Sequence, residues 1–270
     1  MKDLKIVKPI TEDEMIAVFL KAEIVSKRFG KRVLDAVKDE SVSRIIIDKP
    51  DLEDNQENRK RRKVLAAARC YGENKALFSG FPNDVKWYRA VITGEGLKKV
   101  KYIPEDYWVN ISKGTRLPKV AVETIKSGEE IFRQKNNAFW EVAKTVKKGI
   151  RLPELILVGI NVDSMLVVIE GHLRITGYVF DSEHTPQNLE VIIGLSEHMT
   201  EWWAYLDRIR KLRIDKAIYE VDDESKTYRF LRRNPNWQKL SLEENMLNKK
   251  SINGYTRVFR DGTTKKFHIE

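Results

Sequence analysis

Residues 155–180 read LILVGINVDSMLVVIEGHLRITGYVF, and this stretch decides the fold. Two short apolar runs, Leu155–Val158 and Met165–Ile169, flank the polar turn Asn161–Ser164, which predicts a pair of strands. The second run is solidly apolar rather than alternating, so we expect a strand that is buried on both faces. A short helix is predicted to follow over Ile175–Phe180. The stretch therefore predicts a strand–turn–strand–helix unit at the centre of the fold.

The sequence on both sides of this unit alternates between predicted helices and strands, which is typical of an α/β layer. The predicted strands are Trp87–Thr93, Val100–Ile103 and Leu189–Leu195, and the predicted helices are Pro118–Lys126, Asn137–Lys147 and Glu197–Leu212. We therefore predict a compact α/β (α+β) core with a mixed sheet over residues 73–212.

Two further regions flank the predicted core. Residues 1–72 are predicted to be a helical region. A helix is expected over 11–38, with Thr11 as its cap and Gly30 as a point where it kinks or where its first part ends. A second helix is expected over Glu57–Arg69, and Ile45–Ile47 is expected to be a strand or a buried turn. Residues 213–270 are predicted to form a basic extension. It ends in a β-hairpin around Asp261-Gly262, a dipeptide that favours a type I′ turn. The predicted strands of the extension are Ala217–Val221, Thr227–Leu231, Tyr255–Arg260 and Thr263–Ile269.

The composition excludes several classes of protein. The chain has 270 residues, 41% of them hydrophobic and 33% charged, which suits a globular fold with a charged surface. No apolar run reaches the roughly 18 residues that a membrane helix needs, and the charged N-terminus lacks a signal-peptide pattern. A single cysteine, Cys70, and four histidines argue against a disulfide framework and against a cysteine- or histidine-based metal site. A cytoplasmic location is the resulting expectation.

The chain is basic, with a net charge of +10, which favours an anionic partner such as a nucleotide or a nucleic acid. Residues 206–270 hold 16 Lys and Arg against 10 Asp and Glu. The densest basic run is interpreted either as a contact to a nucleic-acid backbone or as the solvated face of a helix. It consists of Arg59, Lys60, Arg61, Arg62 and Lys63.

The residues that best suggest chemistry are Glu170, Gly171, His172, Leu173 and Arg174, which we call the box; it joins a predicted strand to a predicted helix. A helix N-terminus attracts anions, because its first backbone N–H groups lack partners and carry partial positive charge. Gly171 would let the backbone approach a ligand, and the guanidinium of Arg174 would bind a phosphate through a bidentate pair of hydrogen bonds. Alternatively, Glu170 pairs with Arg174 and His172 caps the helix, a purely structural arrangement.

The box admits further roles if it binds phosphate. His172 could donate to a phosphate oxygen or carry a proton, and Glu170 could be a general base or a magnesium ligand. A second candidate phosphate loop is Ser112–Arg116, in which Lys113, Thr115 and Arg116 would contact the anion. This loop lacks the length and order of a Walker A motif, and a plain turn is the alternative. The tryptophans are predicted to be core residues rather than base-stacking platforms.

The order of elements from Val142 to Leu195 resembles the N-terminal domain of the ParB/sulfiredoxin superfamily. The pattern comprises a helix before Gly149, Pro153, two apolar strands, a box with Gly171 and Arg174, a short helix and a third strand. The resemblance implies a ParB/sulfiredoxin-like α/β fold. Sulfiredoxins place a catalytic cysteine where His172 stands, so sulfinic-acid repair is not expected here.

Two other branches of the superfamily bind nucleotides. ParB proteins carry Gly-Glu-Arg-Arg and bind CTP, and this chain keeps only Gly171 and Arg174 of that box. Their second nucleotide motif and their helix-turn-helix are not evident. Free-serine kinases have an acidic-Gly-His-His-Arg box, which Glu170, Gly171, His172 and Arg174 match and Leu173 does not.

The resemblance implies a nucleotide-binding protein that uses Mg²⁺ with ATP or CTP, for phosphoryl transfer or nucleotide hydrolysis. The alternative is a DNA-binding or DNA-processing protein that uses the basic run of residues 59–63 and the basic region of residues 206–270.

Overall fold

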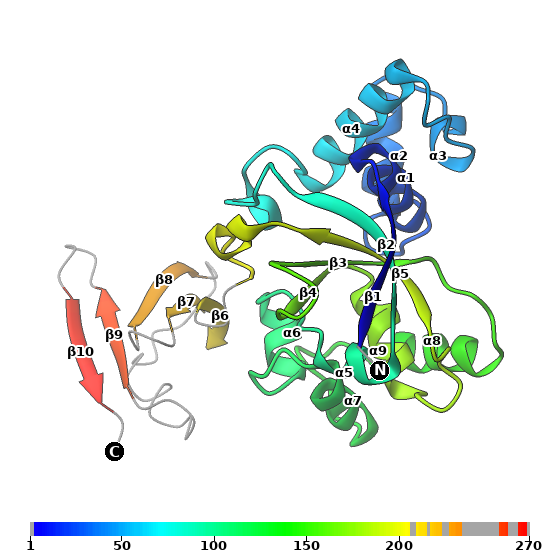
Figure 1. The fold of residues 1–270 in the computed structure, drawn as a ribbon. Helices are drawn as coiled ribbons and strands as arrows, with labels where there is room; N and C mark the ends of the chain where they lie inside the picture. Colours follow the sequence, from blue (N-terminus) through cyan, green and yellow to red (C-terminus); the bar gives the residue numbers. More distant parts are fainter. Residues whose placement is uncertain are drawn as a thin grey trace.

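The computed structural model describes residues 3–205, and beyond them the backbone of strands between residues 209 and 268, with gaps at 206–208, 215–216, 223–226, 234–253 and 259–263. A five-stranded sheet in the order β1-β2-β5-β3-β4 forms the core (Figure 1). Strands β3 and β5 are parallel, and the other neighbouring pairs are antiparallel, so the sheet is mixed. The strands are β1 Leu4–Ile10, β2 Lys86–Ile92, β3 Leu155–Gly159, β4 Leu166–Glu170 and β5 Leu189–Leu195.

The strands predicted from the apolar runs form the buried side of the sheet. Every residue of β3 is buried, as are the first four of β4, which confirms the expectation of a strand covered on both faces. The outer edge of β4 is covered by Lys101, which exchanges two backbone hydrogen bonds with Leu166 and Val168 (2.7 and 2.9 Å). The predicted strand over Val100–Ile103 is therefore reduced to a single bridging residue.

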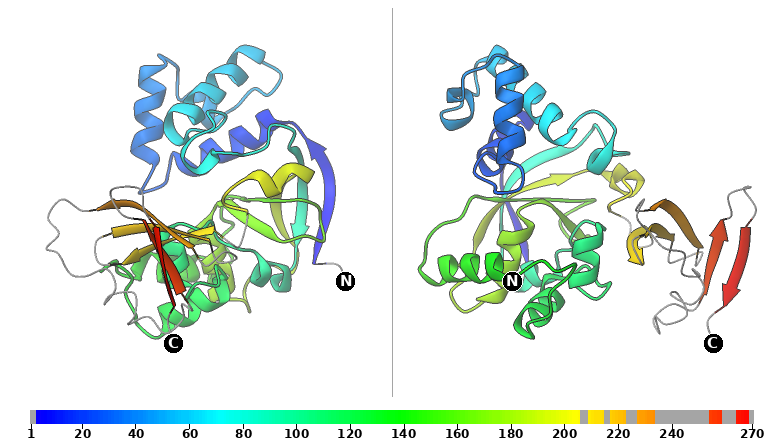
Figure 2. Two further views of the ribbon diagram at one scale, coloured as in Figure 1. Left: turned by 90° about the vertical axis from the view of Figure 1, so that its left-hand side faces the viewer. Right: turned by 180° about the vertical axis from the view of Figure 1, so that it is seen from behind.

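Helices cover both faces of the sheet, which gives three layers (Figures 1 and 2). Alternate residues of β3 point to opposite faces, so Ile156 and Val158 pack toward one helical layer, while Leu155 and Leu157 pack toward the other. The first layer holds α1 Glu12–Glu23, α2 Gly30–Asp39, α3 Ile45–Asp48 and α4 Asn55–Arg69. The second holds α5 Gly94–Lys99, α6 Asp106–Ile111, α7 Pro118–Lys126, α8 Asn137–Lys147 and α9 His172–Phe180.

The N-terminal region is not purely helical, since residues Leu4–Ile10 form β1, an outer strand of the core sheet. Along the chain, the helices of the first layer therefore come after β1 and before β2, two strands that pair with each other. Lys5, Lys8, Pro9 and a register shift between Ile6 and Lys8 make the free edge of β1 unsuitable for pairing with another strand. Because of these same features, the sequence did not predict β1 as a strand.

Three predicted elements differ in detail in the structure. The helix over 11–38 is divided into α1 and α2, because Gly30 packs against the Ile24 carbonyl, where a Cβ would come within 2.6 Å. The Ile45–Ile47 run opens helix α3. The helix over Glu197–Leu212 is a short 3₁₀-helix, Glu197–Glu201, followed by Trp202, whose buried indole donates to the Leu77 carbonyl (2.7 Å). Because the Trp202 ring is buried in the core, the chain turns inward after Glu201 and the helix does not continue.

In the C-terminal region, the backbone of four described strands, β7 to β10, matches the sequence prediction, whereas β6 occupies residues that were predicted to end a helix. β6 Ile209–Ile214, β7 Ala217–Asp222 and β8 Thr227–Arg233 form an antiparallel sheet, while β9 Gly254–Val258 pairs antiparallel with β10 Thr264–His268. The predicted Asp261-Gly262 turn lies outside the described residues.

Over the part of the chain that the structure describes, no helix combines the length and apolarity needed to cross a membrane.

Candidate functional site

The box joins β4 to α9, as the sequence predicted. β4 ends at Glu170, and Gly171 is the N-cap of α9 with φ of +103°, a left-handed conformation that favours glycine. A Cβ at this position would lie 2.5 Å from Leu155 Cδ2 and 3.0 Å from Arg174 Nη2. The guanidinium of Arg174 therefore lies directly against the backbone of Gly171, which no other residue would permit.

The N-terminus of α9 has no side-chain cap among the described residues. The first hydrogen bond of the helix runs from the Ile175 N–H to the Gly171 carbonyl (2.8 Å), so the amides of His172, Leu173 and Arg174 precede the regular helical pattern. These amides carry the positive end of the helix dipole. The strand–glycine–helix junction that the sequence predicted is present at this position.

Arg174 pairs with Glu170 across this helix start, with 2.7 Å between Nη2 and Oε1. Both side chains are largely buried, at 11% and 14% exposure, and the buried Nε of Arg174 has no hydrogen-bond partner among the described residues. The sequence allowed two interpretations of the box, phosphate binding and a purely structural Glu170–Arg174 pair. The ion pair is the second of these. An anion reaching Arg174 would have to share the guanidinium with Glu170 or displace that carboxylate.

His172 does not cap the helix but stacks on two aromatic rings, Trp108 at 4.9 Å and Tyr102 at 5.9 Å between centroids. Its Nε2 atom is buried and has no hydrogen-bond partner in the described part of the chain. Burial lowers the pKa of His172 well below its usual 6.5, and nearby arginine charges lower it further. The imidazole is therefore uncharged at neutral pH. The arginines concerned are Arg69, Arg28, Arg174 and Arg116.

Two of these arginines, Arg28 and Arg69, were not predicted as site residues. Both stack on the ring of Phe29, with 4.8 Å and 3.9 Å between the guanidinium carbon and the ring centre. Arg69 also pairs with the buried carboxylate of Glu23 and interacts electrostatically with Glu170 of the box. Burial lowers the pKa of Arg69, and the charge of Glu170 opposes that effect. We call Arg28 and Arg69, which share the Phe29 ring, the arginine cluster.

The second predicted phosphate loop is a structural turn, and the assignment of Arg116 to it was wrong. Arg116 is buried at 1% exposure, and its guanidinium donates to the carbonyls of Tyr102 (2.6 Å) and Ala204 (2.7 Å). Lys113 pairs with Glu129. Thr115 Oγ1 donates to the Ser112 carbonyl (2.7 Å) and accepts from the Leu117 N–H (3.2 Å). The hydroxyl and the guanidinium thus hold the turn together.

The basic run on α4 presents fewer cations than its sequence suggested. Arg61 is fully buried, so a contact from it to nucleic acid is excluded. Arg62 pairs with Glu12 and Asp13 of α1, and Lys63 lies 3.6 Å from a Glu40 oxygen. Arg59 and Lys60 are exposed and form no ion pair with another described residue. The run is therefore mostly a helix face that ties α4 to its neighbours. The basic side chains of residues 206–270 lie outside the described residues.

Three of the predicted core tryptophans differ in exposure. Trp87 and Trp202 are buried, as expected, whereas Trp140 is 42% exposed and packs edge-on against Phe180.

Among the described residues, no three His, Cys, Asp or Glu side chains gather into a potential metal site. Glu170 thus provides a single carboxylate, and a magnesium ion there would take its other ligands from phosphate oxygens and water.

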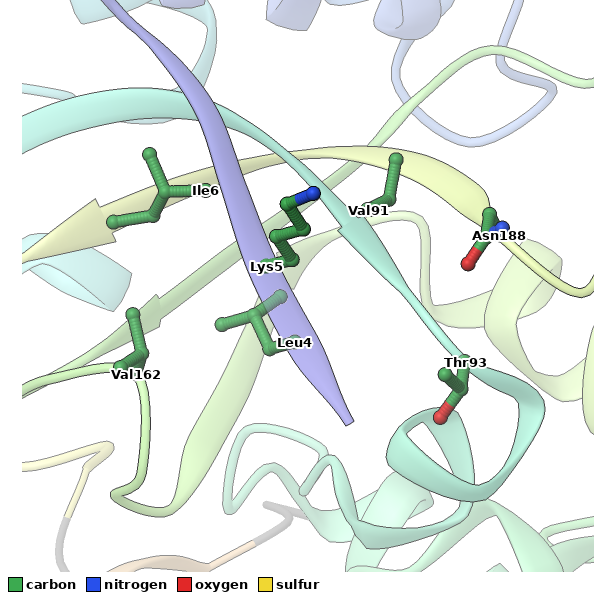
Figure 3. A pocket seen from close by; sticks show the side chains of 7 residues that line it. All are labelled: Leu4, Lys5, Ile6, Val91, Thr93, Val162 and Asn188. Carbon is green, nitrogen blue, oxygen red and sulfur yellow. The ribbon is translucent and has the colours of Figure 1, made fainter. Parts of the chain in front are cut away.

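A pocket of about 430 Å³ lies away from the box, beside β1 and the end of β2 (Figure 3). Lys5 is the one charged residue of its lining, and none of the lining residues belongs to the box or to the arginine cluster. This pocket does not offer the charge that a phosphate requires. It is lined by Leu4, Lys5, Ile6, Val91, Thr93, Val162 and Asn188.

The buried histidine predicts a pH dependence of stability. Unfolded His172 takes up a proton as the pH falls below about 6.5, while folded His172, with its lowered pKa, does not. The free energy of unfolding should therefore decrease from pH 7.5 to pH 5.5. A His172→Phe variant keeps the ring stack but cannot titrate, so its urea midpoint should decrease less over this range. An identical decrease in both proteins would contradict the assignment.

Comparison with known proteins returned no match: no family model, no curated protein and no solved structure among those compared is similar to this chain. The ParB/sulfiredoxin-like resemblance therefore stays a prediction from the sequence.

Proposed function

We propose that this protein binds a nucleoside triphosphate, with the phosphates at the N-terminus of α9. The observation that carries the proposal is the uncapped start of α9 beside Arg174, whose buried Nε has no hydrogen-bond partner among the described residues. The ion pair of Arg174 with Glu170 is balanced in charge, and the helix dipole adds a partial positive charge at the start of α9. A buried guanidinium nitrogen without a partner is costly unless an anion completes its hydrogen bonding.

Each residue of the box has a role in this proposal. The backbone N–H groups that follow Gly171 bind phosphate oxygens, and the guanidinium of Arg174 neutralises charge through paired hydrogen bonds. When the phosphate takes the guanidinium, Glu170 is released from its ion pair. A carboxylate released beside bound phosphates is placed to act as a general base or to hold Mg²⁺, which would screen the phosphate charge.

The reaction class that fits these roles is phosphoryl transfer or nucleotide hydrolysis. His172 is uncharged, and its Nε2 has no hydrogen-bond partner among the residues that the structure describes, so it would serve as a neutral hydrogen-bonding group rather than as a cation. DNA binding has less support, because Arg61 is buried and Arg62 is paired with two acids.

Titration calorimetry of the full-length chain tests the proposal. ATP, CTP and GTP, each with Mg²⁺, are added separately at low salt, and at least one should give saturable heat with a stoichiometry of one. The absence of saturable heat for all three nucleotides up to millimolar concentration would reject nucleotide binding. A parallel titration with duplex DNA would show whether the anion is a nucleic acid instead, through its steep dependence on salt.

A further inference from the structure

We infer that the protein has a second anion-binding surface, at the corner between α1 and α2, and that its partner is the phosphate backbone of a nucleic acid. The surface consists of Lys27, Arg28, Lys31 and Arg32, which we call the basic corner. The inference goes beyond the proposed function, because it predicts binding that does not depend on the box. The residues differ from the basic run of residues 59–63, most of which is buried or paired.

The basic corner concentrates positive charge without acids to balance it. The chain has no Asp or Glu between Glu23 and Asp35, the stretch that holds all four cations. Glu23 is itself buried and paired with Arg69. The four basic side chains are exposed, and none of them forms an ion pair with another described residue. A local excess of this kind attracts a polyanion.

The ring of Phe29 orients the two arginines of the corner. The guanidinium carbons of Arg28 and Arg32 lie 4.8 Å and 5.7 Å from the centre of this ring. Stacking on an aromatic ring orients a guanidinium without neutralising its charge. Each strand of a DNA duplex carries a phosphate about every 3.4 Å along the helix axis. Two guanidinium groups held beside one ring can therefore contact neighbouring phosphates of one strand.

The charges at the start of α2 are opposite to those that would stabilise a helix. The first turn contains Lys31 and Arg32 and no acidic residue. Positive side chains are unfavourable there, because the N-terminus of a helix already carries partial positive charge. Helix α1, by contrast, opens with the acidic residues 12–14. Stability of the helix does not explain the two cations of α2, whereas binding of an anionic partner does.

The position of Phe29 favours a nucleic acid over a membrane as the partner. Basic surfaces that bind membranes usually insert aromatic or other apolar side chains into the bilayer. Phe29 is partly buried, and its ring is contacted by the guanidinium groups of Arg28, Arg32 and Arg69. The ring is therefore not available for insertion. Contacts to phosphates alone carry no sequence information, so we expect binding with little sequence preference.

Fluorescence anisotropy of a labelled DNA duplex, titrated with the full-length chain at several salt concentrations, tests the inference. The wild type should bind, and the logarithm of its affinity should fall linearly with the logarithm of the salt concentration. Lys31→Ala combined with Arg32→Ala should weaken binding about tenfold at low salt and reduce the slope by about 2, because each lost phosphate contact removes about 1. Its melting temperature should be no lower than that of the wild type, since both cations oppose the helix dipole.

Arg59→Ala combined with Lys60→Ala is the matched control. It also removes one arginine and one lysine from the first helical layer, and both are exposed and form no ion pair with another described residue. This variant should bind the duplex within about twofold of the wild type, with an unchanged salt slope. Equal weakening in the two double variants would show that general positive charge binds the duplex, and the inference would be wrong.

Two further arms separate the inference from the proposed function and from membrane binding. Arg174→Ala should bind the duplex as the wild type does, and ATP with Mg²⁺ should not displace the duplex; loss in the variant or displacement by ATP would overturn a separate surface. Because Val25 beside the corner is 69% exposed, vesicles of phosphatidylcholine with and without phosphatidylserine are also tested. Binding to the anionic vesicles but not to the duplex would contradict the inference, as would nucleotide binding without any duplex binding.

Discussion

Replacing Arg61 with alanine should lower the free energy of unfolding by about 3–5 kcal/mol, the range for breaking a buried ion pair from one side. Arg61 is completely buried, and its Nη1 lies 3.0 Å from both the Ile46 carbonyl and Glu57 Oε2. Its Nη2 donates to the Asp51 carbonyl at 2.6 Å and also to Asn58. The variant would leave the buried Ile46 carbonyl and Asn58 side chain without this donor, which is the costly case.

Thermal unfolding followed by circular dichroism measures this effect, and a decrease of about 10 °C in the melting temperature is expected. Arg59→Ala is the control, because Arg59 lies on the same helix but is exposed. That change should alter stability by less than about 0.5 kcal/mol. If the two variants melted together, Arg61 would not be the structural residue described here.

Replacing Arg174 with alanine should weaken nucleotide binding about 100-fold. The guanidinium can form two charge-assisted hydrogen bonds to a phosphate, each worth about 1.5–3 kcal/mol, and some of this is offset because Glu170 no longer has to be displaced. Calorimetry with the nucleotide that binds the wild type best gives the measurement. Circular dichroism should show that the variant remains folded.

Arg151→Ala is the control for the loss of one positive charge. Arg151 is 70% exposed, pairs with Glu190, and belongs neither to the box nor to the arginine cluster. It should bind nucleotide within about twofold of the wild type, since exposed charges are screened by salt. If Arg151→Ala and Arg174→Ala weakened binding equally, the effect would come from overall charge and not from the box.

The central part of the fold could be predicted from the sequence because its signals are local. The apolar runs of β3 and β4 identify buried strands without any tertiary information, and the mixed α/β class follows from their alternation with helices. The strand β1 gave no such signal, because Lys5, Lys8 and Pro9 protect an edge rather than mark a buried face. Trp202 was misplaced because its buried contact with Leu77, which ends the short helix, is formed between residues distant in sequence.

The candidate site was predicted only in part, for the same reason. The position of Gly171 and Arg174 between a strand and a helix could be derived from adjacent residues. The stacking of His172 on Trp108 and Tyr102 depends on the packing of segments distant in sequence, and no spacing in the sequence indicates it. Conversely, Arg61 and Arg116 appeared available in the sequence, yet the fold buries both against backbone carbonyls. Charge in a sequence does not distinguish a surface contact from a buried hydrogen-bonding centre.

The most direct test of the central claim is to locate the bound anion by amide resonances in nuclear magnetic resonance spectra of the full-length protein. Pyrophosphate or the preferred nucleotide is added stepwise, and the shift of each backbone amide is recorded. The account predicts the largest shifts at Gly171, His172, Leu173 and Arg174, where the helix start faces the ligand. Saturable shifts confined to other regions, or no shift at millimolar ligand, would contradict it.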